Sequence, residues 1–258
     1  MTRRPLSIVP LALSALLVSL PLGLHSADPA PTATVAAPSK PTAREAMLAG
    51  AAKMIPLKSD EGAALLDSKA ALDYAPLAAQ WIPQLESHCG AASAVIVQNT
   101  LKPGAAYTQD GLFIPETAHI ITQKVVYEIG FTLEELSNMI TTRSGLKTTR
   151  FHAGTAEGEF GYEAWIAALK KNRRSPKDQI IINYAVNWLY KRENSGGHFS
   201  PVADYNPATN QVLILEVNSL RESFWVDARE VWAAMNQVDS VSGRIRGWIV
   251  VEAPPTEM

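Results

Sequence analysis

The sequence contains a single cysteine, Cys89, among its 258 residues, and this scarcity limits its chemistry. One cysteine excludes an intramolecular disulfide. No CxxC or HxxxH spacing occurs, so the residues offer no dedicated metal site of the common zinc types. Basic residues do not outnumber acidic ones, and the formal net charge is -2. The lack of a basic excess argues against electrostatically driven binding to nucleic acid.

Charged side chains are also absent between Arg4 and Asp28, and residues 6–24 form an apolar run. A basic start, an apolar stretch and small residues at 26 and 27 are typical of a signal peptide. We therefore expect residues 1–27 to be cleaved and the protein to be exported, to the periplasm or outside the cell. The alternative is an uncleaved membrane anchor, because the apolar length is borderline for a span.

The remaining chain has one linker and one folded region. Residues 28–42 are rich in alanine, proline and threonine and have no apolar period, which is typical of an extended linker. No internal repeat occurs, so a solenoid is excluded. Because 47% of the residues are hydrophobic, residues 43–258 can bury the core of a single catalytic domain.

The folded region changes its periodicity near residue 179. Before it, the pattern predicts helices over 89–101, over 133–142 behind a capping box at 132–135, and over 160–169. After it, the pattern predicts strands at 179–184, 197–205, 211–217 and 245–251, with a turn at 206–210 and a helix at 227–236. These signals predict an α+β fold, with a helical half packed on an antiparallel half.

Cys89 is expected where the first of these helices begins, directly before the small residues of GAASA. The N–H groups of a helix N-terminus stabilise a thiolate, which is the attacking form of a nucleophilic cysteine. A buried, inert thiol on a packing face of small residues would give the same local pattern. The local sequence leaves both interpretations open.

Four of the five histidines are poor candidates for the base. His25 lies in the signal segment, and the side chain of His88 should diverge from the adjacent thiol. His119 lies in a helix-like stretch and His152 in a predicted loop, and both are interpreted as structural.

His198 is different because it follows two glycines and opens a predicted strand. With a hairpin turn centred near residue 208, His198 lies opposite about Asn218, with Glu216 one pleat away on the same face. Glu216 is the one charge in an apolar run, so it is either exposed at an edge or kept for a partner. Either residue could orient the imidazole. The chain order of nucleophile, base and orienting group is the papain arrangement, with cysteine on the helical half and histidine on the sheet.

A series of segments extends this likeness to a particular family. They are QLESHCGAAS at 84–93 with Asn99 in the same helix, YTQDGLF at 107–113, PET at 115–117, GHFSPV at 197–202, LEV at 215–217, and Asp239 followed by GRIRGW at 243–248. Together, over roughly residues 84–251, they resemble the phytochelatin synthase family, particularly its short bacterial members, which belong to the papain superfamily.

The resemblance implies a glutathione γ-glutamylcysteinyltransferase. Cys89 would attack the Cys–Gly bond of glutathione, release glycine and hold γ-Glu-Cys as a thioester. His198 and Glu216 would complete the triad, and Gln84 would contribute to the oxyanion hole. Water would then give hydrolysis, and a second glutathione would give phytochelatin.

The resemblance also implies a binding site for the substrate's charged end. Asp239 and Arg246 would hold the amino and carboxylate groups of the γ-glutamyl moiety, beside Gly197. Without the resemblance, a solvated strand edge would explain Arg246. No tightly bound cofactor is implied, and cadmium or zinc would enter as glutathione thiolate complexes.

The sequence departs from the family at several positions. The third triad member is usually aspartate and here is Glu216, and Gln84 lies one residue closer to the cysteine. The arginine that commonly follows an Asn-Tyr pair is missing after Asn183-Tyr184, and two extra residues precede His198. The cysteine-rich region of plant members has no counterpart. These departures favour hydrolysis, because an enzyme that holds a second glutathione poorly loses its acyl group to water.

Two other functions fit the same residues. One is a papain-like peptidase or amidase of different specificity, and the other is a non-catalytic module that binds thiol peptides or metals. The partners that we expect are glutathione and related thiol peptides, and a second copy of the chain in a homodimer. Nucleic acid and a stable membrane anchor after cleavage are not expected.

Overall fold

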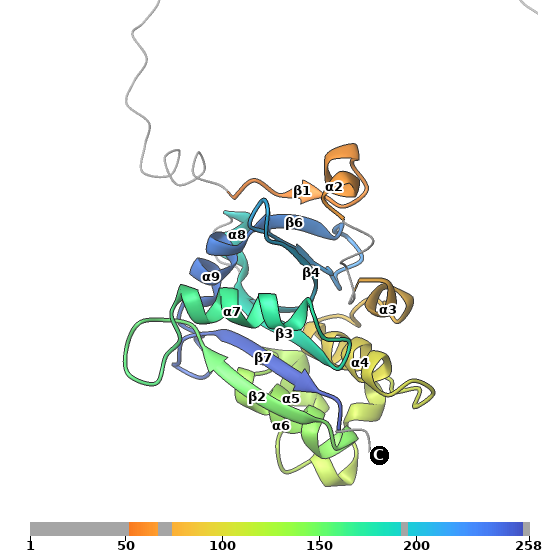
Figure 1. Ribbon diagram of the computed structural model, residues 1–258. Helices are drawn as coiled ribbons and strands as arrows, with labels where there is room; N and C mark the ends of the chain where they lie inside the picture. Colours follow the sequence, from red (N-terminus) through yellow and green to blue (C-terminus); the bar gives the residue numbers. More distant parts are fainter. Residues whose placement is uncertain (1–51, 67–73, 192–195, 255–258) are drawn as a thin grey trace, which may run out of the picture. The chain divides into compact units, whose positions relative to one another are not determined.

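The computed structural model describes residues 52–66, 74–191 and 196–254 (Figure 1). The predicted signal peptide at 1–27 and the predicted linker at 28–42 lie outside the described residues. Within these ranges, every helix is too short or too polar to cross a membrane.

The described residues form a seven-stranded antiparallel sheet with the strand order β1-β6-β5-β4-β3-β7-β2 (Figure 1). The strands are β1 Ile55–Pro56, β2 Lys147–His152, β3 Asp178–Ala185, β4 Gly197–Asn206, β5 Gln211–Ile214, β6 Phe224–Asp227 and β7 Gly247–Glu252. The helices are α2 Asp60–Leu65, α3 Tyr74–Ala79, α4 Cys89–Leu101, α5 Gln123–Ile129, α6 Leu133–Ser144, α7 Tyr162–Asn172, α8 Val186–Tyr190 and α9 Ala228–Met235, with 3-10 turns η1 Asp110–Leu112 and η2 Pro115–Thr117.

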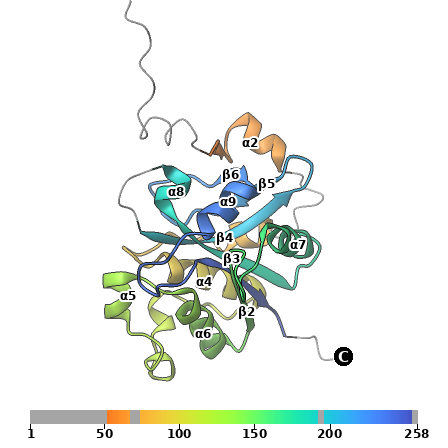
Figure 2. The same ribbon diagram turned by 90° about the vertical axis from the view of Figure 1, so that its left-hand side faces the viewer.

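Helices cover both faces of this sheet (Figures 1 and 2). Ile181 and Phe199 point into one hydrophobic cluster, which includes the buried side chains of α4 and α6. Ile182 and Trp248 point into a second cluster, which includes those of α7 and α9. Successive side chains of a strand point to opposite faces, so the continuous burial of β3 follows from this double cover. The antiparallel sheet agrees with the predicted α+β class, but the helices flank the sheet instead of forming a separate half.

Helix α4 is buried along most of its length, and its first residues are small. Gly90 lies so close to β4 and α6 that an added Cβ would be 2.8 Å from the Phe131 ring and 3.4 Å from the Phe199 ring. A larger residue there would displace the Phe131 ring, directly before α6, and crowd the Phe199 ring of β4. The small residues that follow Cys89 therefore allow the start of α4 to lie directly against the start of β4.

The helices predicted from the N-terminal part of the domain are largely confirmed. Helix α4 has the predicted bounds, and α6 ends two residues later than predicted. Thr132 and Glu135 form the predicted capping box, and Gly145 ends the helix in the left-handed region with φ of 70°. Helix α7 begins two residues later than predicted, because Phe160 forms a bridge with Ala153.

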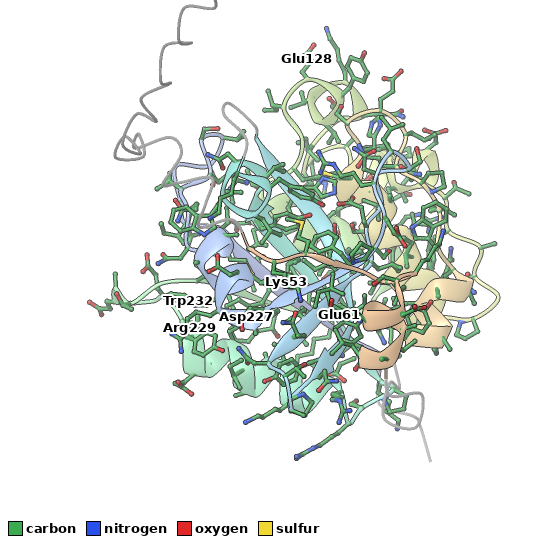
Figure 3. The ribbon with its side chains drawn as sticks, turned by 90° about the horizontal axis from the view of Figure 1, so that it is seen from above. Lys53, Glu61, Glu128, Asp227, Arg229 and Trp232 are labelled. Atoms are coloured by element: carbon green, nitrogen blue, oxygen red, sulfur yellow. The ribbon has the colours of Figure 1, made fainter. Side chains whose placement is uncertain are left out.

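The predicted helix after β6 is also present. Asp227 caps α9 by accepting a hydrogen bond from the Arg229 N–H at 2.7 Å, and Trp232 lies one turn further on (Figure 3). At the other end of the described chain, Lys53 and Glu61 form an exposed ion pair of 2.6 Å that links the segment before β1 to α2 (Figure 3).

The strand predictions were less accurate. Strands β1, β2 and β6 were not predicted, because β1 and β6 are short and the edge strand β2 has no buried face. His152 ends β2 and does not lie in a loop. The last predicted strand starts two residues later, at Gly247. The predicted strand 211–217 ends at Ile214, because the backbone of residues 216 and 217 bonds to segments outside the sheet.

A β-bulge in β4 sets the face on which Glu216 emerges. From the turn, β4 and β5 pair in one register up to Asp204 opposite Leu213, and the next pair is Val202 with Ile214. One residue of β4 is skipped, so the register shifts by one. If the first register continued, Glu216 would lie opposite Pro201. In the second register it lies opposite residue 200, whose side chain is on the same face of the sheet as that of His198. The predicted pairing of His198 and Glu216 on one face therefore depends on the bulge as well as the turn.

The capping box of α6 gives a stability prediction. The Thr132 hydroxyl accepts from the Glu135 N–H at 3.2 Å, so Thr132→Ala leaves that donor without its partner. We expect the free energy of unfolding to fall by about 1 kcal/mol in urea denaturation. Thr149→Ala, on β2, is the matched control and should change it by less than about 0.5 kcal/mol. Equal stabilities of the Thr132 variant and the natural chain would contradict the assignment of this cap.

Candidate active site

Cys89 is the first residue of α4 and is half-buried beside the start of β4, the central strand of the sheet. Its thiol lies beside the imidazole of His198, with which it hydrogen-bonds, and close to the backbone N–H groups of Gly90 and Phe199. Two elements of the fold thus converge on one sulfur: the start of α4, and the start of β4 with its His198 side chain. Such an electropositive setting is what a reactive thiolate requires.

His198 is 5% exposed and is fixed by contacts on both sides. Its Nε2 lies 2.7 Å from Oε1 of Glu216, so Nδ1 is the ring nitrogen left for the thiol of Cys89. The Tyr184 ring, from β3, meets the imidazole edge-on with centroids 5.6 Å apart. The ring can therefore relay a proton between sulfur and substrate without leaving its carboxylate partner.

Glu216 is 1% exposed, and three donors satisfy its carboxylate. Oε1 accepts from His198 and from the backbone N–H of Asn218 at 2.8 Å, and Oε2 accepts from the Tyr190 hydroxyl at 2.9 Å. The side chain of Asn218 instead accepts from the Leu220 N–H at 3.0 Å. Of the two orienting groups left open by the sequence, the structure brings Glu216 and not the Asn218 side chain to His198.

The pKa values show which protonation states this geometry favours. Burial alone would raise the pKa of Cys89, but the His198 charge and hydrogen bond and two backbone N–H groups outweigh it, so the pKa of the thiol is lowered. Burial would lower the pKa of His198, but Cys89 and Glu216 raise it to about 10. Burial also opposes the charge of Glu216, yet the His198 hydrogen bond keeps the pKa of this carboxyl low. The site therefore favours thiolate, imidazolium and carboxylate together.

A cavity of about 270 Å³ opens beside Cys89. Arg246 and Asp239 line it, are 6% and 4% exposed, and form an ion pair with Nη2 to Oδ1 at 3.1 Å. Burial lowers the pKa of Arg246, while Asp239 and then Cys89 act in the opposite direction. A buried, forked cation and a carboxylate in one small cavity can bind a zwitterionic ligand.

Two more residues complete this cavity. Asn183, on β3, is 1% exposed; its Oδ1 accepts from Arg246 Nη1 at 2.9 Å, and its Nδ2 has no hydrogen-bond partner among the described residues. Gly197 lies against the guanidinium, since an added Cβ would be 1.9 Å from Arg246 Nη1. Gly197 was predicted from the sequence, whereas Asn183 was considered only as part of the Asn-Tyr pair before the missing arginine. Its membership of that pair was the signal that could have identified it.

Gln84 is held near the site but does not line the cavity as described. Its Nε2 donates to the carbonyl of Glu86, and its backbone N–H bonds to the Val217 carbonyl at 2.8 Å. Its Oε1 is buried and has no hydrogen-bond partner within the described part of the chain. Gln109 fixes the same segment by bonding to residues 83 and 85. An oxyanion role for Gln84 would require its amide to leave Glu86.

The rings of His88 and His152 bond to backbone carbonyls and not to Cys89. His88 is buried, its Nδ1 donates to the Leu85 carbonyl at 2.8 Å, and its ring packs near Phe113. His152 donates from Nδ1 to the Ile245 carbonyl. These contacts give both rings structural partners.

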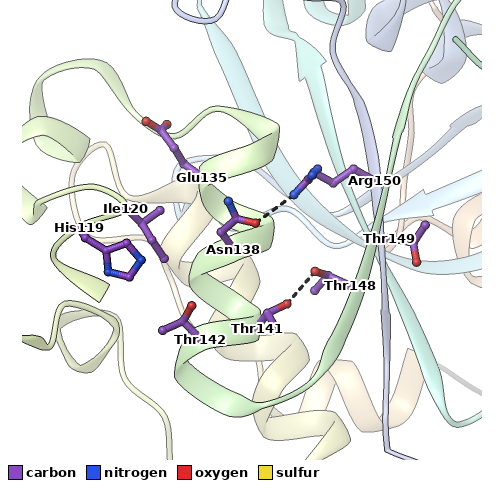
Figure 4. A pocket seen from close by; sticks show the side chains of 9 residues that line it. All are labelled: His119, Ile120, Glu135, Asn138, Thr141, Thr142, Thr148, Thr149 and Arg150. Carbon is purple, nitrogen blue, oxygen red and sulfur yellow. Dashed lines mark hydrogen bonds between the residues drawn. The ribbon is translucent and has the colours of Figure 1, made fainter. Parts of the chain in front are cut away.

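His119 lines a larger cavity of about 810 Å³ between α6 and β2 (Figure 4). Polar side chains of this cavity pair with one another: Arg150 with Asn138 at 3.0 Å, and Thr141 with Thr148 at 2.8 Å. It contains no nucleophilic thiol, and its polar groups are used in joining α6 to β2. Within the described ranges, the chain shows no group of three His, Cys, Asp or Glu side chains arranged to hold a metal ion.

A thiol, an imidazole and a carboxylate in hydrogen-bonded sequence are the groups of a cysteine nucleophile with its base and orienting group. The fold and site thus define a candidate cysteine-dependent enzyme, and the sequence comparisons specify its family. The family profile described as phytochelatin synthase matches residues 45–248. The chain belongs to the phytochelatin synthase family.

Two curated proteins are similar in sequence to this chain. A glutathione gamma-glutamylcysteinyltransferase of Schizosaccharomyces pombe is 26% identical over 187 residues, which cover 70% of this chain and 43% of the relative. Glutathione gamma-glutamylcysteinyltransferase 1 of Arabidopsis thaliana is 33% identical over 176 residues, which cover 66% of this chain and 35% of the relative. The chain thus spans less than half the length of these relatives.

The charges of the site predict the titration of its thiol. Because Cys89 is the only cysteine, ultraviolet thiolate absorbance reports on it alone. We expect the thiolate to form below the ordinary thiol pKa of 9.0, and the paired imidazolium to be lost only near pH 10. In His198→Ala the thiol pKa should rise towards 9.0 or above, since burial remains and the imidazolium is gone. The matched control, His152→Ala, should titrate like the natural chain. If His198→Ala and His152→Ala gave identical thiol titration curves, the thiolate–imidazolium ion pair of Cys89 and His198 would be contradicted.

Proposed function

We propose that this protein cleaves glycine from glutathione through a γ-Glu-Cys thioester on Cys89, and that hydrolysis outweighs phytochelatin synthesis. The observation that carries the proposal is the hydrogen-bonded series of Cys89, His198 and Glu216 beside a cavity that contains a buried Arg246–Asp239 pair. Membership of the phytochelatin synthase family and the names of the relatives support glutathione as the substrate.

Acylation follows from the protonation states of the site. The Cys89 thiolate attacks the carbonyl carbon of the Cys–Gly peptide bond, and the electron pair of the carbonyl moves to oxygen. N–H groups at the start of α4 and the amide of Gln84, if it turns from Glu86, are placed to stabilise that oxygen. The His198 imidazolium then donates its proton to the glycine nitrogen, the C–N bond breaks, and glycine leaves the thioester. Glu216 stabilises the imidazolium before this transfer.

Deacylation uses the same groups in reverse. Neutral His198 takes a proton from water, the oxygen attacks the thioester carbonyl, and the thiolate of Cys89 leaves with γ-Glu-Cys released. If the amine of a second glutathione attacks instead, the product is a phytochelatin. Ala185, Val186 and Asn187 follow the Asn-Tyr pair after which the family commonly has an arginine, and Val186 is buried at the start of α8. None of these residues offers a positive charge to a second glutathione, which supports hydrolysis.

The cavity beside Cys89 supports recognition of the γ-glutamyl end. We assign the substrate carboxylate to Arg246 and the amino group to Asp239, with Asn183 Nδ2 as a further donor to the carboxylate or peptide oxygen. In the unliganded chain the two charges pair with each other, so a zwitterionic ligand replaces one ion pair by two. Gly197 keeps the space that the guanidinium occupies.

Further features belong to the same proposal. A helix-borne cysteine facing a strand-borne histidine supports a papain-like form of the α+β fold. The signal-like residues 1–27 support export to the periplasm or beyond, and a homodimer is expected. We propose that no cofactor is tightly bound. Cadmium or zinc would enter the site as thiolate complexes of the substrate. Size-exclusion chromatography with light scattering tests the homodimer.

The reaction is tested by mass analysis of the products formed from glutathione, with and without cadmium. We expect free glycine and γ-Glu-Cys as main products, with longer thiol peptides a minor fraction. Cys89→Ser should lower glycine release by at least about a thousandfold, because the hydroxyl is not ionised by His198. The affinity of the Cys89→Ser variant for glutathione should stay within a few-fold of that of the natural chain. Equal turnover by both forms, or activity only on other peptides, would overturn the proposal.

Two glycines test the substrate site. Gly197→Ala places a Cβ against the Arg246 guanidinium, and we expect KM for glutathione to rise about tenfold with a smaller change in kcat. Gly161→Ala is the matched control, because Gly161 does not line the cavity and an added Cβ there meets only the Gly154 carbonyl oxygen, at 4.0 Å. The assignment of Arg246 to the substrate would fail if the two alanine variants had the same KM.

A further inference from the structure

The second oxygen of the Glu216 carboxylate has its own donor, which sequence reasoning did not find. Oε1 is used by His198 and the Asn218 N–H, whereas Oε2 accepts from the Tyr190 hydroxyl at 2.9 Å. Tyr190 is the last residue of α8, a helix that lies well before Glu216 in the sequence. A buried carboxylate therefore depends on a side chain from a separate element.

The Tyr190 ring is held in place on more than one side. It meets the Phe224 ring edge-on, with centroids 5.7 Å apart, and the Arg221 guanidinium lies 4.5 Å above its centre. Burial, followed by the charge of Glu216, raises the pKa of the phenol, so it keeps its proton and can only donate to the carboxylate. A rigid ring with a fixed donor restricts rotation of the carboxylate that it binds.

Glutamate needs such a restriction more than aspartate does. Its side chain has one more rotatable bond, so an imidazole bonded at one oxygen does not fix the orientation of the other. The groups that face Glu216 are His198 from β4, Tyr190 from α8 and Arg221 from the loop after β5, whose Nη1 is 3.9 Å from Oε2. Burial, followed by the charge of this carboxylate, also raises the pKa of the Tyr184 phenol, from β3.

We infer that Tyr190 is a positioning residue: its hydroxyl holds the Glu216 carboxylate in the orientation that serves His198. The inference rests on the proposed function of the Cys89–His198–Glu216 site. Helix α8 lies in the segment where the sequence departs from the family pattern. Its Val186 and Leu189 are buried in the second cluster, and the Val186 N–H bonds to the Gly196 carbonyl at 3.1 Å. These anchors present Tyr190 to the carboxylate.

The test removes the hydroxyl and keeps the ring. We expect Tyr190→Phe to lower kcat for glycine release from glutathione about tenfold, the effect of one hydrogen bond to a charged group, with KM unchanged. The thiol pKa of Cys89, followed by ultraviolet absorbance without glutathione, should rise because a less fixed Glu216 stabilises the imidazolium less well. Tyr205→Phe is the matched control: its hydroxyl bonds to Asn210 at 3.2 Å, so both readouts should stay unchanged.

A double-mutant cycle separates positioning from a general structural effect. In Glu216→Ala, adding Tyr190→Phe should cause no further loss of kcat if Tyr190 acts through the carboxylate, whereas an effect transmitted through the neighbouring Tyr184 phenol, whose ring packs edge-on against His198, would persist. Additive losses, or an unchanged kcat and thiol titration in the single variant, would overturn the inference. Thermal melting of each variant shows that it is folded. Because the thiol titration needs no substrate, it tests Tyr190 even if the natural chain releases no glycine, which would overturn only the proposed substrate.

Discussion

The burial of the Glu216 carboxylate is the constraint on which the rest of the site depends. A charge that is 1% exposed is stable only where donors replace the lost water. Here the donors come from separate parts of the fold: His198 from β4, Tyr190 from α8, and the Asn218 N–H from its own loop. Cys89 and then the Glu216 carboxylate raise the pKa of His198, and the imidazolium in turn lowers the pKa of Cys89. One buried negative charge thus supports the ion pair of a thiol two groups away.

The same constraint explains why the surrounding backbone is irregular. The bulge between Val202 and Asp204 shifts the register, and strand β5 ends at Ile214 so that the next residues can bend towards the imidazole. The loop formed there is tied down by the Trp81 indole, which donates to the Glu216 carbonyl at 2.8 Å. A regular hairpin in the register of its turn would have put Glu216 on the opposite face from His198. The irregularity is the means by which the two side chains meet.

Local signals in the sequence were enough for much of the scaffold. Helix α4 was predicted with its observed bounds, because its apolar run starts and stops sharply, and α6 followed from the Thr132 capping box. The edge strand β2 was missed because its side chains alternate in no clear pattern, and the short β6 because it has four residues only. Edge and short strands are stabilised by their neighbours and not by their own composition, so their sequences carry weak signals.

The sequence by itself determined the chemistry that is available: one thiol, few histidines, a lone carboxylate in an apolar run, and the segments that place the chain in its family. The tertiary structure decided which of these groups meet. In the folded chain the Glu216 carboxylate, and not the Asn218 side chain, bonds to His198. The Gln84 amide donates to the Glu86 carbonyl. Tyr190 donates to Glu216, and Asn183 accepts from Arg246. Contacts between residues far apart in the chain depend on register shifts and helix placement, which are set by packing across the whole sheet. Such long-range geometry has no local signature in the sequence, whereas residue identity and local periodicity do.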